Sequence, residues 1–163
     1  MSRATPTGTR PLKLIVTHSR LFRAHWALFV PHAGSETVGT KIHVTGTLAE
    51  GFAHEFQRDF DLESDAKGCG IFLLGSVDDG VVADLRGEPV SAQGTSSASN
   101  RLEEIALDVP APGPSLRSSS STDFKPIEVR DCQSWMAQFI AALVAEGAVA
   151  HSVAEALAKV PVH

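Results

Sequence analysis

Five short segments in the first half of the chain, either apolar or with alternating side chains, constrain the fold more than any other feature. Each is rich in β-branched or aromatic residues and is shorter than a typical helix, so each is expected to form a strand. They cover residues 12–17, 25–30, 41–45, 52–60 and 71–77. The short loop between the second and third favours an antiparallel hairpin, which brings the start of one strand near the end of the next.

The second half of the chain predicts helices. Asn100 and Glu103 have the spacing of a capping box, with Asn100 as N-cap, which opens a helix through about Leu107. Asp131 is expected to cap a longer helix that begins at Cys132, because apolar residues then recur at three- and four-residue spacing. The remaining predictions are the end of this helix at Gly147, a short strand at 127–129 and a last helix at about 150–159.

Together these segments predict an α+β fold, a small antiparallel sheet packed with helices. The length of 163 residues suits one domain. We expect residues 1–11 to be a disordered lead and residues 12–163 to form that single domain. A polar insertion rich in Pro and Ser covers about 86–123, and its part 110–123 is expected to be a mobile connector.

Charge and hydropathy exclude several classes of partner. The net charge is −5, and Lys and Arg are scattered, so no basic stripe for nucleic acid is expected. No apolar run approaches the ~20 residues that an integral membrane segment requires. The N-terminus lacks the apolar segment of a signal peptide, which predicts a cytoplasmic protein with free thiols rather than a disulfide.

Cys132 is the candidate nucleophile, because it is expected where a helix starts. The first backbone N–H groups of a helix have no partners within the helix, and the helix dipole places partial positive charge there. These features favour a thiolate, and the same N–H groups can hold the oxyanion that forms at an attacked acyl carbon. Cys69, in a glycine-rich turn, is interpreted as an incidental thiol.

A thiol nucleophile needs a base and a group that orients the base, and two histidines of the predicted hairpin can supply both. His25 begins the strand HWALFV and is the candidate base. His43 is expected to point away from the face formed by Ile42 and Val44, and it is the candidate orienting residue. His54 is on the next predicted strand and competes with His43 for this role.

The motifs HWALFV, IHV and DCQSW resemble the lecithin:retinol acyltransferase-like branch of the NlpC/P60 papain-like superfamily. Members of that branch are circularly permuted relative to papain, so their order along the chain is His, His, Cys. The resemblance covers roughly residues 12–45 and 124–147 and extends to small fungal proteins with the same pattern. It implies a permuted NlpC/P60 papain-like fold with His25 as base, His43 as orienting residue and Cys132 as nucleophile. The sequence departs from the branch at residue 131, where Asp replaces the common Asn, and at Gln133, where Glu is usual.

The expected function is that of a cysteine-nucleophile hydrolase or acyltransferase that works through a thioester acyl-enzyme. Its substrate would be an amide, ester or thioester of a small molecule, lipid or peptide. Gln133 could approach the oxyanion, and Trp26 and Trp135 are either core residues or walls of a substrate cleft. No cofactor is expected, and no metal, since the histidines lack the common ligand spacings. Two alternatives are a non-catalytic binding module on the same fold and a cyclase or isomerase that reuses the cleft.

Overall fold

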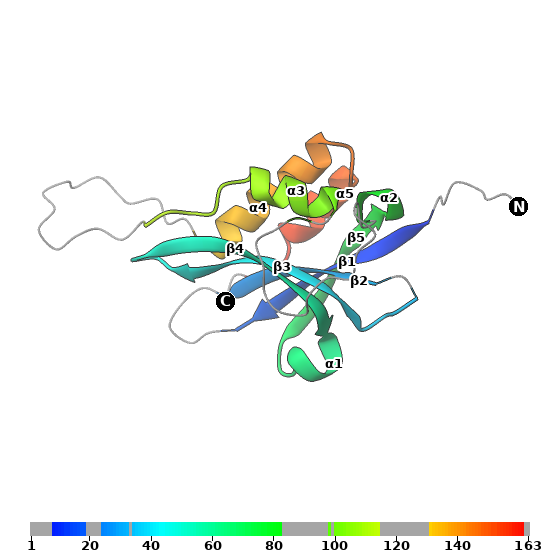
Figure 1. Cartoon of the computed structure of the whole chain (residues 1–163), viewed down its shortest axis with the longest axis horizontal. Coiled ribbons are helices and arrows are strands. Elements are labelled where there is room, and N and C mark those ends of the chain that lie inside the picture. The colour runs from blue at the N-terminus through cyan, green and yellow to red at the C-terminus, as the bar shows by residue number, and fades with distance from the viewer. Residues whose placement is uncertain are drawn as a thin grey trace, which may run out of the picture.

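A computed structural model describes residues 8–18, 24–32, 34–82, 98, 100–114 and 131–161. Five strands form one antiparallel sheet in the order β4-β3-β2-β1-β5 (Figure 1). The strands are β1 (Thr9–Thr17), β2 (His25–Pro31), β3 (Val38–Thr47), β4 (Gly51–Asp61) and β5 (Gly70–Asp78). All five predicted strands are therefore confirmed, and each extends beyond its predicted bounds.

One boundary was wrong. The predicted disordered lead reached residue 11, whereas β1 already begins at Thr9. The reason is pairing with β5, since Thr9 lies opposite Asp78 and Arg10 lies opposite Val77. Pairing with a strand distant in sequence could not be predicted from the polar composition of this segment.

The structure describes five helices, and the longer ones form a layer on one side of the sheet. The five helices are α1 (Leu62–Asp65), α2 (Asp79–Val82), α3 (Arg101–Asp108), α4 (Cys132–Ala145) and α5 (His151–Leu157). Figure 1 shows α3, α4 and α5 above the sheet and the short α1 on the opposite side. The α+β class predicted from the sequence is confirmed. None of the helices in the described ranges is long and apolar enough to cross a bilayer.

The predicted helix caps are present, with one difference. The Asn100 side chain accepts a hydrogen bond from the Glu103 backbone N–H at 2.8 Å, as expected for an N-cap. The Glu103 side chain does not follow the capping-box prediction, because its carboxylate forms a buried ion pair with Arg58 of β4. A buried guanidinium is a stronger partner for a carboxylate than a backbone N–H at a helix start.

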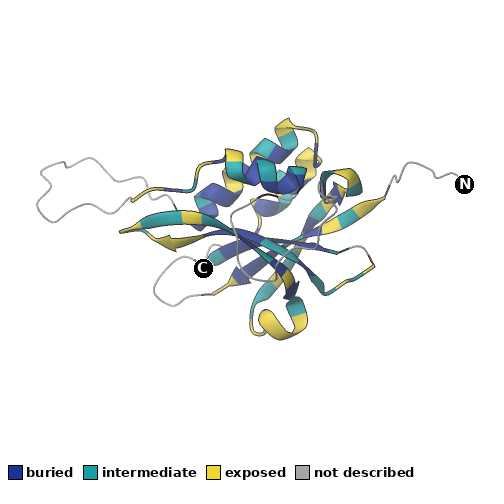
Figure 2. Cartoon of the chain, in the orientation of Figure 1, coloured by how far each residue is buried: buried dark blue, intermediate teal, exposed yellow. Residues whose placement is uncertain are grey.

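The two faces of the sheet carry separate apolar clusters. On the helix side, Trp26, Leu28 and Val30 pack with α3, α4 and α5 in the main core. On the other side, Ala27 and Phe29 pack with residues of β1, β4 and the α1 region in a smaller cluster. Burial is accordingly concentrated in the central strands and on the sides of the helices that face them (Figure 2).

The helix α5 approaches β5 closely at Gly75. A Cβ atom at this position would lie 2.7 Å from Cγ2 of Val153, and the φ angle of Gly75 is +157°. Any larger residue would therefore force the helix away from the strand.

The polar region 86–123 is only partly described, and it contains α3. The predicted strand at 127–129 lies outside the described residues. At the start of the predicted mobile connector, Pro112 is held in place, since its carbonyl accepts a hydrogen bond from the Phe52 N–H at 2.7 Å. This part of the connector is therefore tied to the edge strand β4.

Candidate active site

Three side chains on adjacent strands form a continuous hydrogen-bonded chain. Nε2 of His25 lies 2.7 Å from Nδ1 of His43, and Nε2 of His43 lies 2.7 Å from Oε1 of Glu55. The two imidazole rings meet edge to face, with ring centroids 5.0 Å apart. We call His25, His43 and Glu55 the imidazole relay.

The sheet register places the relay. His43 and Glu55 are directly opposite each other in β3 and β4. Leu28 is opposite Ile42 in the β2–β3 pairing, so His43 falls next to Ala27, two residues from His25. Because side chains alternate along a strand, His25 and His43 share the face of Ala27, which is the face opposite the helix layer. Glu55 was not predicted as a site residue, because its place in the relay depends on this register.

Burial and neighbouring charges keep both histidines of the relay neutral. The pKa of His25 is lowered to about 4, first by burial and then by repulsion from His43 and Lys41. The pKa of His43 is also lowered, mainly by burial, against the opposing effect of its hydrogen bond to Glu55. Only 5% of His43 is exposed. At neutral pH each ring is therefore neutral and has one nitrogen without a proton.

Cys132 is the first residue of α4, as predicted. Its N-cap Asp131 accepts hydrogen bonds from the backbone N–H groups of Gln133 and Ser134, and the Ser134 hydroxyl accepts one from the Asp131 N–H. The thiol is buried and donates to the backbone carbonyl of Ala24 at 3.8 Å. Ala24 directly precedes His25, so the structure brings Cys132 to the end of β2 at which the relay begins.

The thiol and the imidazoles approach this strand end from different sides. Cys132 packs in the core cluster on the helix side, together with Ala24 and Trp26. The side chains of the relay lie on the other face. The structure thus joins His25 to His43 directly, and it places Cys132 beside the backbone of β2 at Ala24.

The three residues expected near the oxyanion or substrate are buried. The Gln133 side chain donates to the Ala24 carbonyl at 2.9 Å. The Trp26 and Trp135 indoles donate to the carbonyls of Pro161 and Val109, at 3.3 and 2.9 Å. Trp135 also stacks on Phe139. Both tryptophans are buried, so they are part of the core rather than walls of an open cleft.

The partner of His25 is His43 and not His54. His54 is opposite Val44, on the helix side of the sheet. Its Nε2 lies 2.7 Å from the Val109 carbonyl, and its ring contacts Trp135. This position removes His54 from the relay and gives it a structural hydrogen bond between β4 and the end of α3.

Cys69 lies on the same face as the relay. Its sulfur is 3.5 Å from Oγ1 of Thr17, and Thr17 is directly opposite His25 in the β1–β2 pairing. Cys69 is half-buried against the smaller apolar cluster. The position of Cys69 on this face was not predicted, because sequence spacing does not show which strands are neighbours in the sheet.

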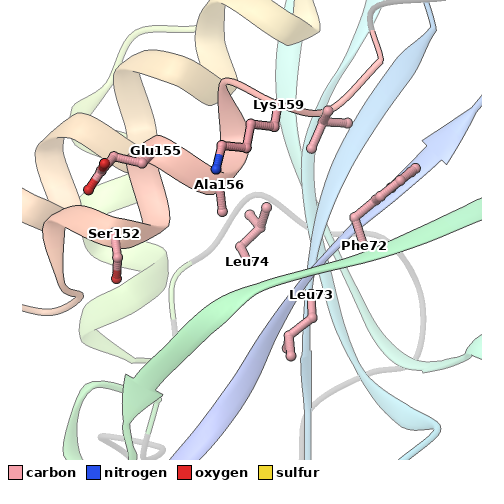
Figure 3. Close-up of a pocket in the computed structure, with 8 residues that line it drawn as sticks. Phe72, Leu73, Leu74, Ser152, Glu155, Ala156 and Lys159 are labelled. Atoms are coloured by element: carbon pink, nitrogen blue, oxygen red, sulfur yellow. The ribbon is translucent and has the colours of Figure 1, made fainter.

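A groove in the described part of the molecule lies away from the relay. It has a volume of about 420 Å³ between β5 and α5, and Phe72, Leu74 and Ala156 contribute to its walls. Figure 3 shows these residues with Lys159 and Glu155 around the groove, whereas Leu73 points away from it. Among the described residues, no group of three or more His, Cys, Asp or Glu is arranged to hold a metal ion.

The sequence was compared with protein families, with curated proteins and with solved structures. No curated protein and no solved structure matches the chain. One family profile matches residues 12–150, which include the relay, α3 and Cys132. The chain therefore belongs to this family, which is described as a family of unknown function, DUF6540.

Proposed function

We propose that the protein is a cysteine-nucleophile hydrolase or acyltransferase in which the imidazole relay supplies the base. The observation that carries this proposal is the chain His25–His43–Glu55, which begins one residue from the backbone carbonyl contacted by the Cys132 thiol. A neutral imidazole oriented by a second group, with a thiol at a helix start nearby, contains the parts that thiol catalysis requires.

Cys132 is the proposed nucleophile. In the resting state its S–H donates to the Ala24 carbonyl from the helix side of the sheet, whereas the imidazole of His25 lies on the other face. The reaction therefore requires this bond to break and the chain at the start of β2 to shift, so that the sulfur and His25 meet at the strand end. The thiol proton then passes to His25, and the sulfur forms a bond to the acyl carbon while the carbonyl electron pair moves to oxygen. Collapse of this intermediate expels the leaving group, which takes the proton from His25. Water or a second nucleophile releases the acyl group from the thioester by the reverse sequence.

The order of these residues along the chain supports a permuted NlpC/P60 papain-like assignment, with the lecithin:retinol acyltransferase-like branch as the proposed relative. His25 begins a strand, His43 is on the next strand, and Cys132 begins a helix that packs on β2. This is the order His, His, Cys of the permuted enzymes. The proposed substrate is an amide, ester or thioester of a small molecule, a lipid or a peptide.

Cys69 is a second candidate nucleophile for the same reaction. It lies on the relay face, with Thr17 between its sulfur and the strand of His25. Cys132 has the advantage of its position at the start of α4, where the helix dipole favours a thiolate, whereas Cys69 precedes a strand. The two thiols are therefore to be compared in one experiment.

The test is the rate of alkylation of each thiol by iodoacetamide at pH 6–7, followed by mass spectrometry of the peptides. We expect Cys132 to react at least ~10-fold faster than Cys69 and to lose about 100-fold in rate in His25→Ala, because the base is removed. His151→Ala is the matched control, since this exposed histidine is on α5. It should leave both rates unchanged.

Two other results are informative. Fast, His25-dependent labelling of Cys69 in a Cys132→Ser variant would assign the nucleophile to Cys69. Equal and slow labelling of both thiols, unaffected by His25→Ala, would contradict the enzyme and leave a non-catalytic binding module on this fold.

A further inference from the structure

We propose that Glu55 is a positioning residue that sets the direction of proton transfer through the relay, so that Nδ1 of His25 is the nitrogen that accepts the thiol proton. This inference rests on the proposed function and deepens it. Glu55 does not touch the reacting atoms and acts through His43.

The carboxylate of Glu55 determines which nitrogens of the relay carry protons. An ionised carboxylate can only accept hydrogen bonds, so the proton of the 2.7 Å contact with Glu55 must be on Nε2 of His43. A neutral imidazole has one N–H, which leaves Nδ1 of His43 as an acceptor. The 2.7 Å contact between the rings then requires His25 to donate from its Nε2. The remaining nitrogen of His25, Nδ1, has the lone pair.

The neighbours of Glu55 hold it in this role. The side-chain amide of Gln57 donates to Oε1 of Glu55 at 3.0 Å, the same oxygen that accepts from His43. Gln57 therefore restricts the carboxylate rotamer. Lys41 is close enough to Glu55 for their charges to interact. The charge of Glu55 raises the pKa of Lys41, whereas burial lowers it.

A negative charge at Glu55 also favours the protonated relay during the reaction. The charge of Glu55 opposes the lowering of the pKa of His25 and of His43, whereas Lys41 adds to it. When His25 takes the thiol proton, the negative charge of Glu55, two strands away, stabilises the positive charge on His25. Removal of this charge should make His25 a weaker base without moving the rings.

The substitution Glu55→Gln tests this role, because it removes the charge and allows the amide to donate toward His43. We expect a fall of about ten-fold in the alkylation rate of the reactive thiol. Long-range ¹H–¹⁵N NMR spectra at pH 7 should show His25 protonated on Nε2 in the native protein and a change of tautomer in the variant. Glu55→Asp retains the charge and should restore part of the rate. Glu50→Gln, in the exposed turn after β3, is the matched control.

The possible failures are distinguishable. If native His25 is protonated on Nδ1, or if Glu55→Gln changes neither the tautomer nor the rate while His25→Ala does, the role of Glu55 is overturned and the enzyme proposal stands. If His25→Ala leaves the thiol rates unchanged, the proposed function fails, and the NMR tautomer of His25 still decides whether Glu55 sets the direction of the relay.

Discussion

The relay places two neutral histidines in contact on a face of the sheet that also carries Lys41. Burial and like charges both oppose protonation of His25, which explains why its pKa is lowered to about 4. In the unfolded chain the same side chain titrates near 6.5. Folding therefore discriminates against the charged form of this single residue.

The first prediction concerns the dependence of stability on pH. Between pH 6.5 and 4 the unfolded chain binds a proton at His25 and the folded chain does not, so the free energy of unfolding should fall as the pH falls through this window. The contribution of His25 is at most about 3 kcal/mol. Urea denaturation between pH 7.5 and 4 measures it.

The variant His25→Asn is the control for this prediction, since it removes the titrating group and keeps a polar side chain. Its stability should vary less with pH in the same window. An unchanged pH dependence in His25→Asn would show that other groups cause the loss of stability.

At the scale of the elements, the start of α4 positions the thiol. Asp131 accepts two backbone N–H groups, and Ser134 completes the reciprocal bond. This capping box fixes where the first turn begins, and the first turn holds Cys132 and Gln133 against Ala24. The cap therefore links helix stability to the placement of the candidate nucleophile.

We predict that Asp131→Ala lowers the free energy of unfolding by about 1 kcal/mol, the usual cost of losing an N-cap. Asp131→Asn should retain most of the stability, because an amide oxygen can still accept both hydrogen bonds. Thermal or urea denaturation followed by circular dichroism gives both values. Equal stability of the alanine and native proteins would contradict the role of the cap.

Sequence patterns predicted the strands and the caps because these depend on local periodicity and on residues a few positions apart. Two four-residue helices, α1 and α2, were missed, since such short segments show no helical period. Glu55 and Cys69 were missed as neighbours of His25 for a different reason. Their positions depend on strand order and register, which bring residues of four strands to neighbouring positions on one face of the sheet. The opposite faces used by Cys132 and the imidazoles also follow from the register.

At the scale of the whole molecule, an ion pair connects the helix layer to the sheet. Arg58 of β4 and Glu103 of α3 are both buried, and the guanidinium contacts the carboxylate. The guanidinium also lies over the Phe56 ring, 5.8 Å from its centroid. A polar contact in the middle of an apolar interface fixes how α3 sits on β4.

We predict that Arg58→Met destabilises the protein by about 3–5 kcal/mol, because Glu103 loses this cation while it stays buried. The double variant Arg58→Met/Glu103→Gln should regain a large part of this loss. A double-mutant cycle by urea denaturation measures the coupling between the two residues. Additive effects of the single substitutions would contradict a direct energetic link.

The contacts within the candidate site join residues that are separated by very different distances along the chain. The contacts of the relay join residues 18 and 12 positions apart, whereas the thiol contact with Ala24 joins residues 108 positions apart. Closing the longer loop has a higher entropic cost and is slower. During synthesis on a ribosome, the three strands that carry the relay emerge long before residue 132. A growing chain would thus assemble the candidate base first and gain the candidate nucleophile only when α4 docks, so that any reaction of this thiol that depends on the relay would wait until the core has closed.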